Sequence, residues 1–214
     1  MTRIALIHAL AHSVAPINDE LARAWPEATR MNLLDDSLSA DLARSGAGLD
    51  VAMHARFRLL ADYAVGTGAH AILFTCSAFG SCIEAVAQAH PQIAVLKPNE
   101  AMVQEACEAG GRIGLVASFA ATLTSMPPEF PDGTDLRCAL TEDAMLALNA
   151  GDTEAHDRYV VEAARALAAE GCKVIGLAQF SMARAAAAVR EALGLPVFTT
   201  PGSAVKALRR RIAG

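Results

Sequence analysis

A cysteine and a glutamine stand at matching places in two similar segments of the chain. Cys76 follows the apolar run 71–75 and opens a small polar tip, and Gln179 follows the apolar run 173–178 in the second half. A thiol can act as an acid, a base or a nucleophile, whereas an amide does none of these at neutral pH. The duplicated pattern therefore predicts a site with one reactive group, not two.

Cys76 is predicted to lie where a helix begins, and unpaired backbone N–H groups there stabilise anions. This field is expected to lower the pKa of the thiol and favour the thiolate. The neighbouring amides and the Ser77 hydroxyl are suited to bind a carboxylate. The alternative is that Cys76 is a small buried residue at a strand end, because free cysteine is often buried. The remaining cysteines are predicted to be packing residues: Cys82, Cys107, Cys138 and Cys172.

The spacing of the histidines predicts no metal site, and the glycines form no nucleotide-binding motif. His8 and His12 are four residues apart across a strand end and a loop, and no third ligand completes a metal set. His8 itself is a candidate substrate-binding group at a strand tip. No Gly-x-Gly-x-x-Gly, Walker or Gly-x-Ser-x-Gly motif occurs, so we expect no cofactor. Three further histidines are predicted to be surface or helix-face residues: His54, His90 and His156.

Composition narrows the class of protein further. The 214 residues are 53% hydrophobic and 19% charged, which favours a folded domain with a large core. The net charge of −5 argues against binding to nucleic acid or to an anionic membrane surface. No apolar stretch reaches the roughly 20 residues needed to span a bilayer. Five cysteines without paired spacing indicate a reducing, cytoplasmic setting.

Short apolar runs alternate with longer helical patterns along the chain. Asp50 is predicted to cap a helix that ends near Gly66, and Asp35 with Asp36 is predicted to form a turn or a helix cap. Strands are predicted at 3–10, 31–34, 71–75, 93–96, 112–119, 137–140, 173–178 and 196–198. Further helices are predicted at 79–89, 98–109, 153–170, 181–193 and 201–214.

The second half repeats the order of the first. This predicts an α/β protein of two pseudo-symmetric lobes, each a mostly parallel sheet flanked by helices. The lobes are expected at 1–97 with 201–214, and at 98–200. Ligands of parallel sheets bind beyond the C-terminal strand ends, so the expected active-site cleft lies between the lobes.

Four motifs, in this order and spacing, resemble the aspartate/glutamate racemase superfamily. They are Ile-Ala-Leu-Ile-His at 4–8, Phe-Thr-Cys-Ser-Ala at 74–78, Arg-Ile-Gly-Leu-Val-Ala-Ser at 112–118 and Gly-Leu-Ala-Gln-Phe-Ser-Met at 176–182. That group includes glutamate, aspartate and hydantoin racemases, maleate isomerase and arylmalonate decarboxylase. The resemblance implies an enzyme without metal or pyridoxal phosphate, in which two cysteines flank the substrate α-carbon. Members often form dimers, so the resemblance is also compatible with a homodimer.

The resemblance assigns roles to several residues. It makes Cys76 the first catalytic cysteine, while the second is replaced by Gln179, which can hydrogen-bond a substrate instead. The substrate-binding residues that it implies are His8, Ser77, Ala78, Ser118, Gln179, Phe180 and Ser181.

Two functions of different classes follow from these residues. The first is a cofactor-independent enzyme that acts on a small carboxylate through an enolate-like or covalent-thiol intermediate, by racemization, cis–trans isomerization or decarboxylation. The second is a non-catalytic binder of a small anion at the same residues, which would not need Cys76. A dinucleotide-binding oxidoreductase fits the α/β pattern but lacks the glycine fingerprint.

Overall fold

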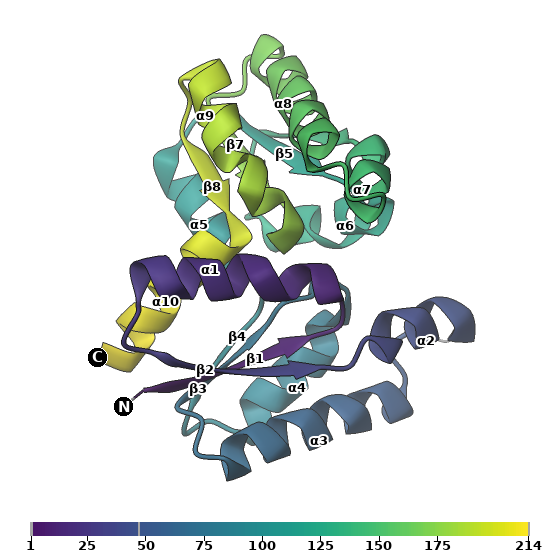
Figure 1. Ribbon diagram of the computed structural model, residues 1–214, viewed down its shortest axis with the longest axis vertical. Helices are drawn as coiled ribbons and strands as arrows, with labels where there is room; N and C mark the ends of the chain where they lie inside the picture. The colour runs from purple at the N-terminus through teal and green to yellow at the C-terminus, as the bar shows by residue number, and fades with distance from the viewer. Residues whose placement is uncertain (1, 47, 214) are drawn as a thin grey trace. The chain divides into compact units, whose positions relative to one another are not determined.

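The computed structural model describes residues 2–46 and 48–213 and divides into two compact units. Unit 1 comprises Met1–Pro98 and Ala204–Gly214, and unit 2 comprises Asn99–Ser203. Each unit contains a four-stranded parallel sheet flanked by helices (Figure 1). The predicted α/β class with two parallel sheets is therefore confirmed.

Unit 1 has the strand order β2-β1-β3-β4. All neighbouring strands run parallel, and helices cover both faces of the sheet (Figure 1). The strands are β1 (Arg3–His8), β2 (Thr29–Leu34), β3 (Ala71–Phe74) and β4 (Ala94–Leu96). The helices are α1 (Val14–Ala24), α2 (Ser37–Ser45), α3 (Val51–Gly66), α4 (Gly80–Ala89) and most of α10 (Thr200–Ala213).

Unit 2 repeats this topology with the strand order β6-β5-β7-β8, again all parallel. The strands are β5 (Ile113–Ala117), β6 (Leu136–Leu140), β7 (Val174–Leu177) and β8 (Val197–Thr199). The helices are α5 (Glu100–Ala109), α6 (Ala120–Ser125), α7 (Glu142–Asn149), α8 (Thr153–Ala169) and α9 (Ala186–Leu193). Among the residues described, no helix is both long and apolar enough to cross a membrane.

The central strands are buried on both faces, as the continuous apolar runs predict. Every residue of β3, β5 and β7 is buried. Because side chains alternate along a strand, Val116 joins the core formed with α8 and α9, whereas Leu115 joins the core formed with α5. Gly114 keeps α8 close to β5, since a Cβ atom there would lie 3.0 Å from Leu167.

The two longest helices both begin with an aspartate side-chain cap. The Asp50 side chain accepts the Met53 backbone N–H at 2.8 Å, which confirms the predicted cap of α3. Asp152 accepts the Ala155 N–H at 2.9 Å at the start of α8. These equivalent caps show that the repeat extends to the helix starts.

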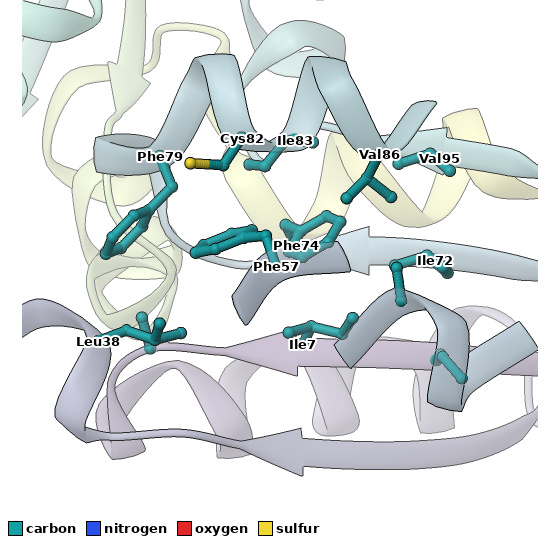
Figure 2. Close-up of a cluster of buried hydrophobic side chains, with 14 of the residues drawn as sticks. Ile7, Leu38, Phe57, Ile72, Phe74, Phe79, Cys82, Ile83, Val86 and Val95 are labelled. Atoms are coloured by element: carbon teal, nitrogen blue, oxygen red, sulfur yellow. The ribbon is translucent and has the colours of Figure 1, made fainter. Parts of the chain in front are cut away.

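An aromatic cluster in unit 1 holds the segment after β3 in place. Phe57 of α3 lies 5.3 Å from Phe74 of β3 and 4.9 Å from Phe79, measured between ring centroids (Figure 2). Cys82 is buried in the same cluster, so its predicted packing role is confirmed. The cluster fixes residues on both sides of Cys76.

The structure adds four helices that the apolar pattern does not predict: α1, α2, α6 and α7. Each buries few residues, since α2 has only Leu38 buried and α7 only Ala144. A sparse apolar pattern gives little periodic signal. Two predicted helices also begin later than expected, because 3₁₀ turns precede them: η2 (Ser77–Phe79) before α4, and η4 (Phe180–Ala185) before α9.

Candidate active site at the strand ends

The polar tips of unit 1 meet at the C-terminal ends of β1 and β3. Ile7 pairs with Phe74 in the parallel register, which places His8 beside Thr75. Cys76 follows in an extended conformation, and Ser77 and Ala78 form the 3₁₀ turn η2. Ser77 is half-buried and Ala78 is exposed. Three of the predicted site residues are therefore consecutive beside the end of β1.

Cys76 is a half-buried free thiol. Burial raises its pKa above the usual thiol range, and this exceeds the opposing effects of the Ala78 backbone N–H and the Ser39 hydroxyl. The prediction of a lowered pKa is wrong, because the loss of solvent around the sulfur outweighs the backbone N–H of the short 3₁₀ turn. Cys76 is consequently a neutral thiol at neutral pH.

Ser39 is a site residue that the sequence does not reveal. Its hydroxyl donates to the carbonyl oxygen of Ala9, the residue after β1, at 3.2 Å, and its proximity to the Cys76 sulfur opposes the rise in the pKa of that thiol. It lies on α2, and the position of α2 depends on tertiary contacts. Arg56 of α3 donates to Asp35 at 2.6 Å and to Asp41 at 2.7 Å.

Asp35 also explains how α2 begins. Its carboxylate accepts the Ser37 hydroxyl at 2.6 Å and the Ser37 backbone N–H at 3.2 Å, which confirms the predicted turn. Asp36 occupies the N-cap position but makes no side-chain cap. Hydrogen bonds from Ser37 and Arg56 lower the pKa of Asp35 despite an opposing effect of burial, so its carboxylate stays charged and holds α2.

Replacing Ser39 with alanine is expected to slow alkylation of Cys76 by iodoacetamide about five-fold at about pH 8. The thiolate would lose its hydroxyl donor, so the pKa of Cys76 would rise further. Peptide mass spectrometry resolves the rate at Cys76 from the rates at the other cysteines. The control is Ser45→Ala at the other end of α2. Equal rates in the two variants would contradict a role for Ser39.

His8 is fully buried, and both of its ring nitrogens have side-chain partners. Nδ1 lies 2.9 Å from the Thr75 hydroxyl, and Nε2 lies 3.0 Å from Asn32 Oδ1. Asn18 Nδ2 donates to the same Asn32 oxygen at 2.7 Å. We therefore assign an acceptor role to that oxygen, a proton to Nε2 and an acceptor role to Nδ1.

Burial lowers the pKa of His8, although the hydrogen bond to Asn32 opposes this shift. The imidazole is therefore neutral at neutral pH. Its hydrogen bond to Thr75 fixes the position of the residue immediately before Cys76. A substrate contact to His8 would have to replace one of these two partners.

In unit 2, Gln179 connects the ends of β5 and β7. Its Oε1 accepts the Ser118 backbone N–H at 3.0 Å and the Ser118 hydroxyl at 3.4 Å. Its Nε2 donates to the Thr122 hydroxyl at 2.8 Å. Phe180 and Ser181 follow in η4 and are buried. Sequence reasoning misses Thr122, whose position on α6 carries no motif.

His156 lies on α8, as the helix-face alternative predicts, but it is buried and not on the surface. The first turn of α8 packs against η4, where Arg184 donates to Asp157 at 2.8 Å. His156 Nδ1 lies 2.7 Å from the same Asp157 oxygen. Burial of this position depends on which face of α8 is covered, and the local sequence does not encode that.

Within residues 2–46 and 48–213, no three side chains of histidine, cysteine, aspartate or glutamate come together as a metal site.

Comparison with known proteins identifies the family. Residues 11–208 match the family model described as Asp/Glu/Hydantoin racemase. No curated protein sequence matches the chain significantly.

Solved structures with the same fold share few identical residues with this chain. An aspartate racemase from Picrophilus torridus has a TM-score of 0.73 at 11% identity, covering 100% of this chain and 95% of that one. An allantoin racemase from Pseudomonas fluorescens has a TM-score of 0.71 at 18% identity, with coverages of 99% and 91%. Arylmalonate decarboxylase has a TM-score of 0.64 at 16% identity, with coverages of 100% and 94%. Because the family match spans most of the chain, the protein belongs to the Asp/Glu/hydantoin racemase family and is a racemase-like enzyme.

Proposed function

We propose that this protein is a cofactor-independent enzyme that acts on a small carboxylate, with Cys76 as its only catalytic thiol. The observation that carries the proposal is the half-buried free Cys76, which lies between Thr75, paired with His8 at the end of β1, and the 3₁₀ turn η2. The equivalent place in unit 2 holds Gln179, which has no acid or base function. One-thiol chemistry therefore fits this chain better than a symmetric two-thiol racemization.

The neutral state of Cys76 favours a role as proton donor. A substrate that loses carbon dioxide beside a carbonyl group becomes an enolate-like carbanion, because the electron pair of the broken C–C bond stays on the α-carbon. The Cys76 S–H bond then breaks, its proton moves to the α-carbon, and the electron pair stays on sulfur. The resulting thiolate is stabilised by the Ala78 N–H and the Ser39 hydroxyl and takes a proton from water. Covalent addition needs the thiolate first, which burial disfavours.

Ser77 and the backbone of η2 are the groups that we assign to the substrate carboxylate. They directly follow Cys76, and Ser77 is half-buried rather than sealed in the core. Unpaired N–H groups at the start of a turn bind anions well. The bound carboxylate would thereby lie next to the thiol that protonates its α-carbon.

Deuterium incorporation from D2O tests the proposal. The panel includes aspartate, glutamate, a 5-substituted hydantoin, allantoin and 2-substituted malonates, because related structures include amino-acid and allantoin racemases and a decarboxylase. We expect deuterium at the α-carbon of at least one compound, on one face only. If no compound shows exchange, isomerization or decarboxylation, the enzyme proposal fails.

One observation favours the non-catalytic binder as the second candidate. The raised pKa of Cys76 leaves its thiol neutral, and a purely structural cysteine also has a neutral thiol. A binder would keep ligand affinity in a Cys76 variant and show no turnover in either form.

A further inference from the structure

A network of charged hydrogen bonds around Arg56 joins α3 to α2 within unit 1. The guanidinium donates to Asp35 at 2.6 Å, to the Ser37 hydroxyl at 2.6 Å and to Asp41 at 2.7 Å. Asp35 precedes α2, and Asp41 lies within it. Because Ser39 lies between these two carboxylates in the chain, Arg56 holds α2 on both sides of Ser39.

Packing alone fixes α2 weakly. Leu38 is its only buried residue and belongs to the same apolar cluster as Phe79 (Figure 2). The helix has nine residues and ends at Gly46, which is in the left-handed conformation. A helix this short is marginal without tertiary contacts. A network of several charged hydrogen bonds contributes more than an isolated surface ion pair, so the position of α2 depends on Arg56.

The same helix lies against the thiol of Cys76. The Ser39 hydroxyl donates to the carbonyl oxygen of Ala9, the residue after β1, at 3.2 Å. Cys76 packs against the apolar cluster that contains Leu38. Burial is the largest cause of the raised pKa of Cys76, and Ser39 opposes the rise. The position of α2 therefore affects both how far water reaches the sulfur and where the Ser39 hydroxyl lies.

We propose that Arg56 is a positioning residue for Cys76, which acts by holding α2 against the ends of the strands of unit 1. In this position α2 keeps water away from the thiol and keeps the Ser39 hydroxyl beside it. Arg56 acts through α2 and not on the substrate. The inference deepens the proposed function and rests on it, because a thiol that protonates a carbanion needs controlled surroundings.

Arg56→Ala is expected to speed alkylation of Cys76 by iodoacetamide at least about five-fold at about pH 8. Release of α2 would let water reach the sulfur, and the lost burial would outweigh the lost Ser39 hydroxyl. The effect is therefore opposite in sign to that of Ser39→Ala. The curve of rate against pH should also shift to lower pH, because the pKa of the thiol would fall. Peptide mass spectrometry of the full chain follows each cysteine separately.

Two controls separate this local effect from general loosening of the fold. Arg58→Ala replaces an exposed arginine two residues further along α3 and should retain the wild-type rate and pH curve. Cys82 is buried on α4 in the same unit, so its alkylation reports loosening of the core. In Arg56→Ala we expect Cys82 to react as slowly as in the wild type.

Two milder variants test the network if Arg56→Ala does not fold. Arg56→Lys keeps the charge but loses the planar fork that bridges two carboxylates. It should restore part of the protection, with a Cys76 rate between those of the wild type and Arg56→Ala. Asp41→Asn removes one of the two carboxylates and should speed alkylation of Cys76 about two-fold.

Three results would overturn the inference. These are an unchanged Cys76 rate and pH curve in Arg56→Ala, equal effects of Arg56→Ala and Arg58→Ala, or equal acceleration at Cys82. Failure of the proposed function has a different signature. Alkylation of Cys76 would still respond to Arg56, while the D2O panel would show no exchange, isomerization or decarboxylation. If both hold, Arg56→Ala should also lower turnover about 10-fold.

Discussion

Serine in place of Cys76 is expected to lower turnover about 10²–10⁴-fold, the usual loss when one positioned acid/base group is removed. The serine hydroxyl nearly preserves the size of the side chain, but it is a much weaker acid than the thiol. Ligand affinity should change less than about three-fold, because Ser77 and the η2 backbone remain. Turnover is followed as deuterium incorporation or product release with the best compound of the D2O panel.

Cys138→Ser is the matched control for this experiment. Cys138 is an exposed free thiol on β6, so its predicted packing role is wrong, and its replacement removes a thiol without disturbing a core. We expect its turnover to equal that of the wild type. Full activity of the Cys76 variant would exclude Cys76 as the catalytic group. Unchanged binding with no turnover in any form would favour the anion binder.

Acidification is expected to destabilise the protein through His8. Burial lowers the pKa of His8 in the folded state from its usual value of 6.5. The folded state therefore binds a proton on His8 less readily than the unfolded state does. The stability due to neutral His8 is fully present above about pH 6.5 and is lost as the pH falls through the lower folded-state pKa. Urea unfolding between about pH 7.5 and pH 5 measures this loss.

The His8→Asn variant separates the effect of His8 from other titrations. At about pH 7.5 it should lower the free energy of unfolding by about 2–4 kcal/mol, because it leaves a cavity and imperfect partners for Thr75 and Asn32. Below about pH 6.5 its stability should fall less steeply than that of the wild type. Leu59→Ala, which replaces an exposed side chain without a titratable group, should retain the wild-type slope. Parallel slopes for wild type and His8→Asn would contradict the assigned neutral histidine.

Short-range sequence patterns predict most of the strands and helices of this protein. The run 71–75 becomes β3, and Asp50 caps α3, because strand alternation and cap chemistry act over a few residues. Cys82 was predictable as a packing residue from its place within a helix. His156 was not, because the same helical pattern is compatible with an exposed or a covered face. Helix α2 was also missed, since tertiary ion pairs through Arg56 hold it.

The sequence by itself determined the α/β class, the repeat of two parallel sheets and the placement of Cys76 and Gln179 after equivalent strands. These follow from short-range apolar periodicity, which a chain carries in its residue order. Only the tertiary structure decided that Ser39 reaches Cys76, that its thiol is neutral and that Gln179 binds Ser118. Ionisation of the Cys76 thiol depends on the loss of solvent around the sulfur and on hydrogen-bond donors from distant parts of the chain. No local sequence pattern encodes either of these.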